Sequence, residues 1–212
     1  GLDLGEDIAL DSLLELVRRG RETDSFVWID MEAFEYRDVT LDIYRRAVEA
    51  EGTEHVGICL QAYLRASPQD LEALLPLVPS IRFVKGAYAE PPEIAFPDRK
   101  SVDEAFFQLG VRTLEGGGRS AFGTHDAGLV ERLRSWVGEH EIDSKRYEFQ
   151  MLFGIRADLQ QRLAESGEPM RVLISYGPAW FPWYMRRLAE RPANVWFVVK
   201  NMVRPGGFRT RR

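Results

Sequence analysis

The feature that most constrains the fold is a regular alternation of short apolar runs with longer amphipathic segments. The apolar runs are rich in the β-branched and aromatic residues typical of strands. They are FVWID (26–30), HVGICLQAYL (55–64), IRFVKGAY (81–88), SAFGTHD (120–126), YEFQMLFG (147–154) and RVLISYG (171–177). The helix-like segments between them lie at 39–50, 67–78, 99–116, 127–140 and 155–167. Six β-then-α units with near-continuous apolar strands predict a parallel sheet that is buried on both faces.

Small polar residues, proline and glycine predict where two of the helices begin and end. Ser67 is expected to cap a helix that starts with Pro68. Gly167 is expected to end the helix before the strand at 171–177. A seventh apolar run, NVWFVVK (194–200), follows the last segment, and its period alone does not decide whether it is a strand.

A parallel sheet with alternating helices is either a doubly wound open sheet or a (β/α)8 barrel. A doubly wound nucleotide fold would carry G-x-G-x-x-G after its first strand, and this sequence has none there; the glycines at 116–118 precede a strand and indicate a turn. In a barrel, function collects at the C-terminal ends of the strands. Those ends are polar here, with Asp30, Glu32, Gln61, Tyr63, Lys85, Tyr88, Thr124, His125, Asp126, Gln150 and Tyr176. We therefore expect an α/β fold, a (β/α)8 TIM-type barrel with about six of its eight βα units present in this chain.

The composition fits one domain with a substantial core. The chain has 212 residues, of which 45% are hydrophobic. Its formal net charge of −5 argues against nucleic acid as a partner. No apolar run reaches the roughly 18–20 residues that span a bilayer. The one cysteine, Cys59, excludes an intrachain disulfide, which fits a cytoplasmic protein, and its apolar strand predicts a buried, unreactive thiol.

Asp30 and Glu32 form a candidate pair of carboxylates at the end of the first strand. Because they are two residues apart, an ideal strand directs both to the same face. Such a pair is suited to binding a metal or to acid–base chemistry, and the alternative is a pair of solvated acids at a strand end. Asp30 directly follows four apolar residues, which makes it the stronger functional candidate.

Arg82 and Lys85 bring two cations to the third strand. A charged arginine inside a barrel needs an anionic partner, and Asp30 is suitable, either for function or as a structural ion pair. On an ideal strand Arg82 and Gly86 share one face, while Lys85 and Ala87 share the other. Gly86 suits a place where a ligand or another backbone approaches closely. Lys85 also permits a different enzyme, a lyase that forms a Schiff base with its amine.

The segment GTHDAG places Thr124 and His125 at the end of the fourth strand. A lone histidine is more often a hydrogen-bonded core residue than a metal ligand. His55 and His140 lie in other contexts, so the sequence contains no histidine cluster. We therefore expect no metal site.

Arg186 and Arg187 are adjacent and come after an aromatic-rich stretch at 180–184. On a helix, neighbouring side chains project about 100° apart, so both reach one ligand only if it lies between them. Ion pairs with Glu190, three or four residues on, are the alternative and would explain one arginine. They do not explain the aromatic residues. Guanidinium groups beside an aromatic wall suit a ligand with a carboxylate and an apolar body.

Several of these stretches together resemble one family. They are DME (30–32), QAYLR (61–65), RFVKGAY (82–88), THD (124–126), YEFQMLFG (147–154) and YGPAWFPWYMRRLAERPAN (176–194). In this order they are similar to bacterial proline dehydrogenase, above all the monofunctional enzymes, and more loosely to the same domain of bifunctional proline-utilisation proteins. The resemblance covers essentially the whole chain. It implies a distorted (β/α)8 barrel with non-covalent FAD that oxidises L-proline to Δ1-pyrroline-5-carboxylate, with its last helix across the barrel mouth.

By matching motifs, the resemblance implies roles for individual residues. Arg186 and Arg187 would clamp the proline carboxylate. Glu190 would support the two arginines and would also be one of the residues that hold the cofactor. Asp30 and Arg82 would be the paired catalytic residues, with Arg82 beside the reacting edge of the flavin. The other residues that would hold FAD are Met31, Gln61, Lys85, Gly86, Ala87, Thr124 and His125. The residues that would wall the substrate are Tyr88, Leu152, Tyr176 and Trp183.

The chain departs from the family pattern in two places. Trp183 stands where the family often has tyrosine, which removes a hydroxyl group from the predicted substrate wall. The family also begins with two further strands, and residues 1–20 resemble the family's segment after the second of those strands. We therefore expect residues 1–203 to be a barrel without its first two strands, in a fragment of a longer protein, with a basic tail at 204–212.

The resemblance implies that electrons pass to a membrane quinone. We therefore expect a cytoplasmic protein with peripheral contact at the inner face of the plasma membrane. The four arginines at 204–212 would suit an anionic surface, and a disordered tail is the alternative. Pyrroline-5-carboxylate dehydrogenase is the expected pathway partner. Two other functions stay open, a Schiff-base lyase that uses Lys85 and a non-catalytic remnant that only binds flavin.

Overall fold

All six expected strands form, and they pair side by side in sequence order. The computed structural model describes residues 1–178, so the predictions for the run at 194–200 and the tail at 204–212 lie outside the described residues. The strands are β1 (Val27–Ile29), β2 (Val56–Gln61), β3 (Ser80–Val84), β4 (Arg119–Gly123), β5 (Tyr147–Leu152) and β6 (Met170–Leu173). Every neighbouring pair is parallel, which confirms the predicted α/β class and its six parallel strands with alternating helices.

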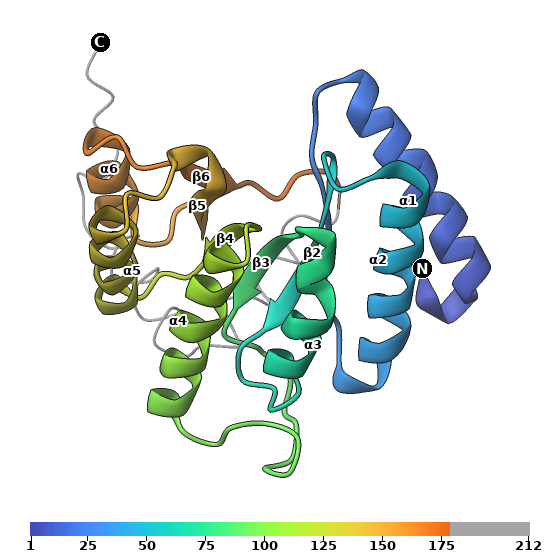
Figure 1. Cartoon of the computed structure of the whole chain (residues 1–212), viewed down its shortest axis with the longest axis horizontal. Helices are drawn as coiled ribbons and strands as arrows, with labels where there is room; N and C mark the ends of the chain where they lie inside the picture. The colour runs from blue at the N-terminus through green and yellow to red at the C-terminus, as the bar shows by residue number, and fades with distance from the viewer. Residues whose placement is uncertain (179–212) are drawn as a thin grey trace.

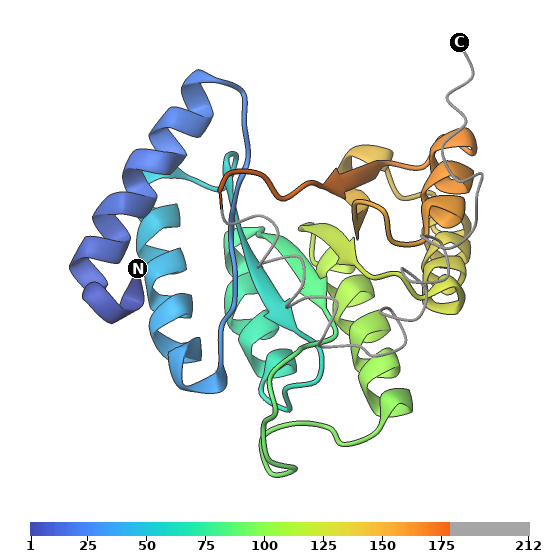
Figure 2. The same ribbon diagram turned by 180° about the vertical axis from the view of Figure 1, so that it is seen from behind.

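The helices lie on the outer side of a curved sheet, so that the strands form part of a TIM-type barrel (Figures 1 and 2). They are α1 (Glu6–Glu22), α2 (Arg37–Glu51), α3 (Ser67–Leu74), α4 (Arg99–Glu115), α5 (Ala127–Glu139) and α6 (Ala157–Glu165). Five of them match the expected helical segments. The sixth, α1, was not among them, although Leu10, Leu13 and Val17 are buried at helical spacing against the core. No helix among residues 1–178 is long and apolar enough to cross a membrane.

The predicted cap at Ser67 is wrong, whereas the predicted helix end at Gly167 is confirmed. Ser67 is the first helical residue, and its hydroxyl donates to the backbone carbonyl oxygen of Gln61 at 2.7 Å instead of capping the helix. The hydroxyl instead ties the start of α3 to the end of β2. Gly167 comes after α6 with φ +80°, the left-handed conformation that commonly ends a helix.

Aromatic residues fill the layer between the sheet and the helices. Phe83, Phe122 and Phe149 lie on one rung across β3, β4 and β5 and are fully buried. The rings of Phe122 and Phe149 are 5.5 Å apart, and Phe106 of α4 lies 6.3 Å from Phe83 and 6.4 Å from Phe122. Each such side chain contributes roughly 1.5–3 kcal/mol through burial. This row fixes the register of the three central strands.

Side chains alternate along a strand, so the residues directly before and after each of these phenylalanines point to the inner face. One inner rung contains Cys59, Arg82, Ala121 and Glu148. The next rung, closer to the strand ends, contains Gln61, Val84, Gly123 and Gln150. The polar and charged side chains of these rungs thus lie on the inner face, while large aromatic side chains pack on the outer face.

Candidate active site

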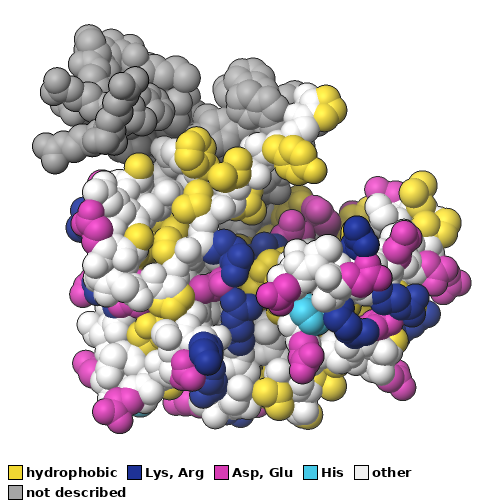
Figure 3. Space-filling model, turned by 90° about the horizontal axis from the view of Figure 1, so that it is seen from above, with side chains coloured by type: hydrophobic (Ala, Val, Ile, Leu, Met, Phe, Trp, Pro, Cys, Tyr) yellow, Lys and Arg dark blue, Asp and Glu magenta, His cyan; other side chains and the backbone are white. Residues whose placement is uncertain are grey.

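A cavity of about 390 Å³ opens at the C-terminal ends of the strands. Its walls come from all six strands or the loops after them, as the barrel prediction requires. The lining residues that the sequence singled out are Asp30, Met31, Glu32, Gln61, Arg82, Lys85, Gly86, Ala87, Tyr88, Thr124, His125 and Leu152. Cys59, Val84, Gly123, Gln150, Met151 and Leu173 complete the lining. On the face shown in Figure 3, basic and acidic side chains lie side by side, in keeping with the ion pairs that Arg82 and Lys85 form.

Arg82 and Asp30 form the ion pair that the sequence predicted. The Arg82 guanidinium donates to Asp30 across the space between β3 and the end of β1. It also lies over the ring of Trp28, with 5.4 Å between the guanidinium carbon and the ring centroid. The Arg82 side chain is 11% exposed, whereas that of Asp30 is 75% exposed. A nearly buried cation therefore faces the cavity with its partner at the rim.

Lys85 lines the cavity together with Arg82, although an ideal strand would direct the two side chains to opposite faces. The reason is that β3 ends at Val84, and strand alternation no longer governs the next residue. Its ammonium group pairs with Asp103 and, at 2.9 Å, with Asp126. A lysine nucleophile needs a free amine, and this lysine is held between two carboxylates.

Asp126 connects the cavity wall to helix α5. Its carboxylate accepts from the backbone N–H groups of Gly128 at 3.1 Å and Leu129 at 3.3 Å, and therefore caps the helix. It also accepts from Lys85 and Arg99. Burial alone would raise the pKa of the Asp126 carboxyl, but the hydrogen bonds from Lys85 and Arg99 hold it well below its ordinary value. Asp126 thus stays ionised and holds Lys85 in place.

Gly86 is required by the close approach of an aromatic ring. Its φ of +110° is a conformation that side chains disfavour, and a Cβ built there would lie 2.1 Å from Cδ1 of Tyr63. The sequence predicted close approach at Gly86 by a ligand or backbone, and the group in contact is the Tyr63 ring. Beyond it, the Tyr88 hydroxyl donates to Glu32, which brings the loop after β3 to the end of β1.

Gln61 and the Thr124–His125 segment are held by the ends of neighbouring strands. The Gln61 amide nitrogen donates to the carbonyl oxygens of Met31 at 3.1 Å and Glu32 at 3.3 Å. The side-chain oxygen of Gln61, Oε1, is buried and has no hydrogen-bond partner within residues 1–178. The Leu152 N–H donates to Nε2 of His125 at 2.9 Å. His125 therefore joins β4 to β5, and no cluster of metal-ligating side chains occurs in the part of the chain that the structure describes.

One predicted residue that the structure describes, Tyr176, is not brought to the cavity. Tyr176 lies after β6, is 93% exposed and does not line the cavity. Trp183, Arg186, Arg187 and Glu190 lie outside the described residues. Their roles stay predictions.

The sequence placed Gln150 among the polar strand ends but gave it no specific role, and it treated Cys59 only as a buried thiol. Both point to the inner face, and both line the cavity. The strand register identifies both residues. Cys59 pairs with Arg82, and Val84, two residues after Arg82, leads through Gly123 to Gln150. The missing information was the pairing register, which no local pattern supplies.

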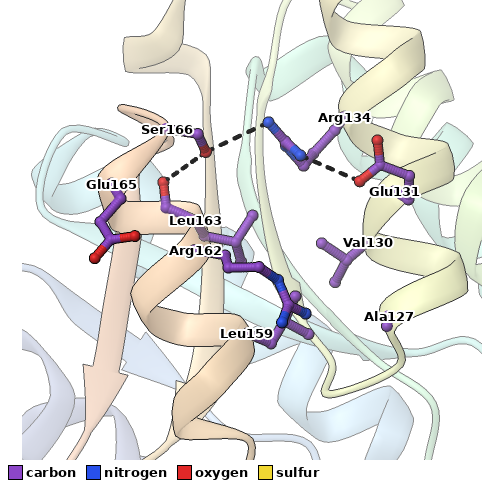
Figure 4. A pocket seen from close by; sticks show the side chains of 9 residues that line it. All are labelled: Ala127, Val130, Glu131, Arg134, Leu159, Arg162, Leu163, Glu165 and Ser166. Atoms are coloured by element: carbon purple, nitrogen blue, oxygen red, sulfur yellow. Dashed lines mark hydrogen bonds and ion pairs between the residues drawn. The ribbon is translucent and has the colours of Figure 1, made fainter.

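A second pocket, a groove of about 560 Å³, lies on the outside of the barrel, between α5 and α6 (Figure 4). Val130, Leu159 and Leu163 form part of its lining. Arg134 donates to Glu131 at 3.1 Å and to the Ser166 hydroxyl at 3.3 Å, so its charge is already partnered. No strand end contributes to this groove, and none of the predicted site residues lies in it.

The comparisons with known proteins agree on one family. The family model described as "Proline dehydrogenase" matches residues 3–200. "Proline dehydrogenase 1" of Bacillus subtilis (strain 168) is 41% identical over 204 residues, which are 96% of this chain and 67% of that protein. "Proline dehydrogenase" of Deinococcus radiodurans is 40% identical over 200 residues, 94% of this chain and 64% of that protein.

Among solved structures, proline utilization A from Bdellovibrio bacteriovorus, inactivated by N-propargylglycine, superposes with a TM-score of 0.79 at 25% identity. The match covers 88% of this chain and 22% of that much longer chain. The chain thus spans about two thirds of the curated relatives and about a fifth of the solved chain. Family model, relatives and fold agree, and the chain belongs to the proline dehydrogenase family of oxidoreductases.

Proposed function

We propose that this chain is the catalytic barrel of an enzyme that binds FAD non-covalently and oxidises L-proline to Δ1-pyrroline-5-carboxylate. This reaction would be the first step of proline breakdown to glutamate, with a quinone as electron acceptor. Membership of the family and relatives named proline dehydrogenase at 40–41% identity support the proposal. The observation that carries it is the Arg82–Asp30 pair, which puts a nearly buried cation in a cavity formed by strand ends.

Three features of the cavity fit the flat, polar ring of a flavin. The side-chain amide oxygen of Gln61, Oε1, is a buried acceptor without a protein partner within residues 1–178, and a flavin ring has an N–H that such an oxygen would accept from. Val84 and Gly123 leave the inner face between β2 and β5 free of large side chains. Arg82 supplies positive charge. When bound, the flavin would supply atom N5 as the acceptor of a hydride from C5 of proline.

The cavity residues would have different roles in holding a flavin ring. Arg82 would stabilise negative charge on it, because a nearly buried guanidinium is only weakly screened by water. Asp30 would hold the guanidinium in place. Other residues proposed to contact FAD are Met31, Gln61, Lys85, Gly86, Ala87, Thr124 and His125. Lys85 would serve through its position and charge, since two carboxylates hold its ammonium group.

The substrate would lie between this ring and the open side of the cavity. Tyr88 and Leu152 line the cavity and are proposed as part of its wall. Trp183 would complete the wall. Arg186 and Arg187 would bind the proline carboxylate through charge-assisted hydrogen bonds, with Glu190 as their support. Fixing the carboxylate and the ring together would orient the reacting carbon.

An absorbance spectrum of the full protein that contains this chain tests the proposal. Flavin bands that L-proline bleaches without oxygen are expected, and quinone should restore them. A colourless protein that borohydride traps with a carbonyl substrate would instead indicate the lyase. Flavin bands that proline never bleaches would indicate a non-catalytic remnant. The ion pairs of Lys85 disfavour the lyase.

The proposal extends to organisation and partners. Residues 1–203 would belong to the barrel and residues 204–212 to a basic tail. Quinone would be met by peripheral contact with the inner face of the plasma membrane, from the cytoplasm. Pyrroline-5-carboxylate dehydrogenase would use the product. Sedimentation with quinone-containing vesicles, compared at low and high salt, tests the membrane contact.

A further inference from the structure

We propose that Gln160 is a positioning residue for the substrate, although it lies on helix α6 and does not line the cavity. Its side-chain amide holds the turn at 152–155 and thereby fixes Leu152, which the proposed function places in the substrate wall. The inference deepens the proposed function and rests on it for the contact between Leu152 and proline. No motif in the sequence singled out Gln160.

Leu152 lies where β5 extends beyond its neighbour β4. The paired residues of these two strands end at Gly123 and Gln150, two residues before Leu152. On the other side, Leu152 pairs with Leu173 of β6, whose carbonyl oxygen accepts from the N–H of Phe153 at 2.9 Å. A strand therefore supports Leu152 on one side only. On the side of β4, its backbone N–H and C=O groups need other partners.

Two side chains supply these partners. The Leu152 N–H donates to Nε2 of His125 at 2.9 Å. The Leu152 carbonyl oxygen accepts from Nε2 of Gln160 at 2.9 Å. The same nitrogen donates to the carbonyl oxygen of Ile155 at 2.8 Å, so both protons of the amide group are used within this turn. Side chains thus determine the position of Leu152 where the sheet stops.

Gln160 links the two ends of the turn. The N–H of Ile155 donates to the carbonyl oxygen of Leu152 at 3.2 Å, and Gly154 between them has φ +77°. Ile155 is 3% exposed and is fixed in the core, whereas Leu152 lines the cavity. Because the amide bonds to both carbonyl oxygens, it ties Leu152 to the fixed position of Ile155. Without the amide, the bond at 3.2 Å would be left to close the turn.

The loss of this amide should affect proline and not the flavin. A wall residue acts through its position, and a small displacement of a bound substrate lowers its rate of reaction steeply. The residues proposed to hold FAD lie in or after strands β1 to β4, and neither hydrogen bond of Gln160 goes to one of them. Changes at Gln160 should therefore lower kcat/KM for proline and leave the content of bound flavin unchanged.

Steady-state kinetics with L-proline on the full protein that contains this chain test the inference. Gln160→Met removes the donor at nearly equal volume, and Gln160→Glu keeps the shape but puts a group that only accepts hydrogen bonds against two carbonyl oxygens. Each should lower kcat/KM about five- to fiftyfold, the effect of one or two lost hydrogen bonds. Gln161→Met is the matched control, because Gln161 is the next residue of α6, is exposed, and donates to Glu165 at 2.7 Å and not to the turn.

A double variant distinguishes positioning from a general loss of stability. If Gln160 acts through Leu152, Gln160→Met should have little further effect on kcat/KM once Leu152→Ala is present. An undiminished effect in that background, or an equal effect in Gln161→Met, would overturn the positioning role. If Gln160→Met does not fold, Gln160→Glu takes its place in the same comparison.

Hydrogen exchange gives a measurement that does not depend on turnover. The backbone amides of residues 152–155 should exchange faster in Gln160→Met than in wild type or in Gln161→Met. Unchanged exchange there would overturn the role of the amide in holding the turn. A wild-type protein whose flavin is not reduced by proline would refute the proposed function and this inference with it. Normal proline oxidation that neither variant of Gln160 alters would refute this inference alone.

Discussion

Replacing Gly86 with alanine should destabilise the protein in two separable ways. The backbone there has φ +110°, which costs a residue with a Cβ roughly 1–2 kcal/mol. The new Cβ would also lie 2.1 Å from the ring of Tyr63, which is 8% exposed and has little room to move. Forcing an extra carbon into such packing costs roughly 1–3 kcal/mol. The expected total loss in unfolding free energy is therefore about 2–5 kcal/mol, a large share of the roughly 5–15 kcal/mol of a typical domain.

Urea unfolding of wild type and variant measures this loss as a lower midpoint at an unchanged slope. Gly52→Ala is the matched control, because Gly52 also has positive φ, +76°, but no atom lies within 4 Å of a Cβ built there. It should lose only the conformational part, about 1–2 kcal/mol. Adding Tyr63→Leu to Gly86→Ala should restore part of the loss by removing the clash. Equal losses in Gly86→Ala and Gly52→Ala would refute the assignment of a packing role to Gly86.

Three further predictions concern charged side chains. Asp126→Ala should lower the unfolding free energy at pH 7 by about 1–3 kcal/mol. Because the pKa of this carboxyl in the folded protein lies below its ordinary value of 3.8, the stability advantage of the wild type should be complete above pH 3.8 and should shrink in urea titrations below it. An advantage that grows on acidification would contradict the reasoning. Arg82→Lys should keep bound flavin but lower kcat/KM for proline by about 10- to 100-fold, since an ammonium group does not reproduce the guanidinium geometry toward Asp30; steady-state kinetics at wild-type rates would refute the role. Arg187→Ala should raise KM for proline by about 10- to 100-fold while the protein stays yellow, and unchanged proline affinity in titrations would remove the carboxylate clamp.

The sheet was predictable because each strand carries its own signal. Every expected strand forms, since β-branched and aromatic runs bounded by turn residues determine strands locally. The ion pair of Arg82 with Asp30 was predictable from the cost of burying an unpaired charge. Both conclusions need only local sequence and one physical rule.

The errors arose where a residue's surroundings come from distant segments. Strand alternation does not describe Lys85, because β3 ends at Val84 and where it ends depends on the loop after it. Ser67 was predicted as a cap, but its hydroxyl donates a hydrogen bond to the backbone carbonyl oxygen of Gln61 instead. The position of Cys59 in the cavity lining depends on its register with Arg82 on the neighbouring strand, which sequence patterns do not contain.

Every strand pairs only with its neighbours in the sequence, and this arrangement has a consequence for folding. Each pairing closes a loop of one βα unit, so the sheet is able to grow stepwise from any adjacent pair without distant contacts. The cavity behaves differently, because its lining extends from Asp30 after β1 to Leu173 of β6. It is complete only when the last of these strands has docked. Ligand binding should therefore appear as the final kinetic phase of refolding, after the helical signal has been regained.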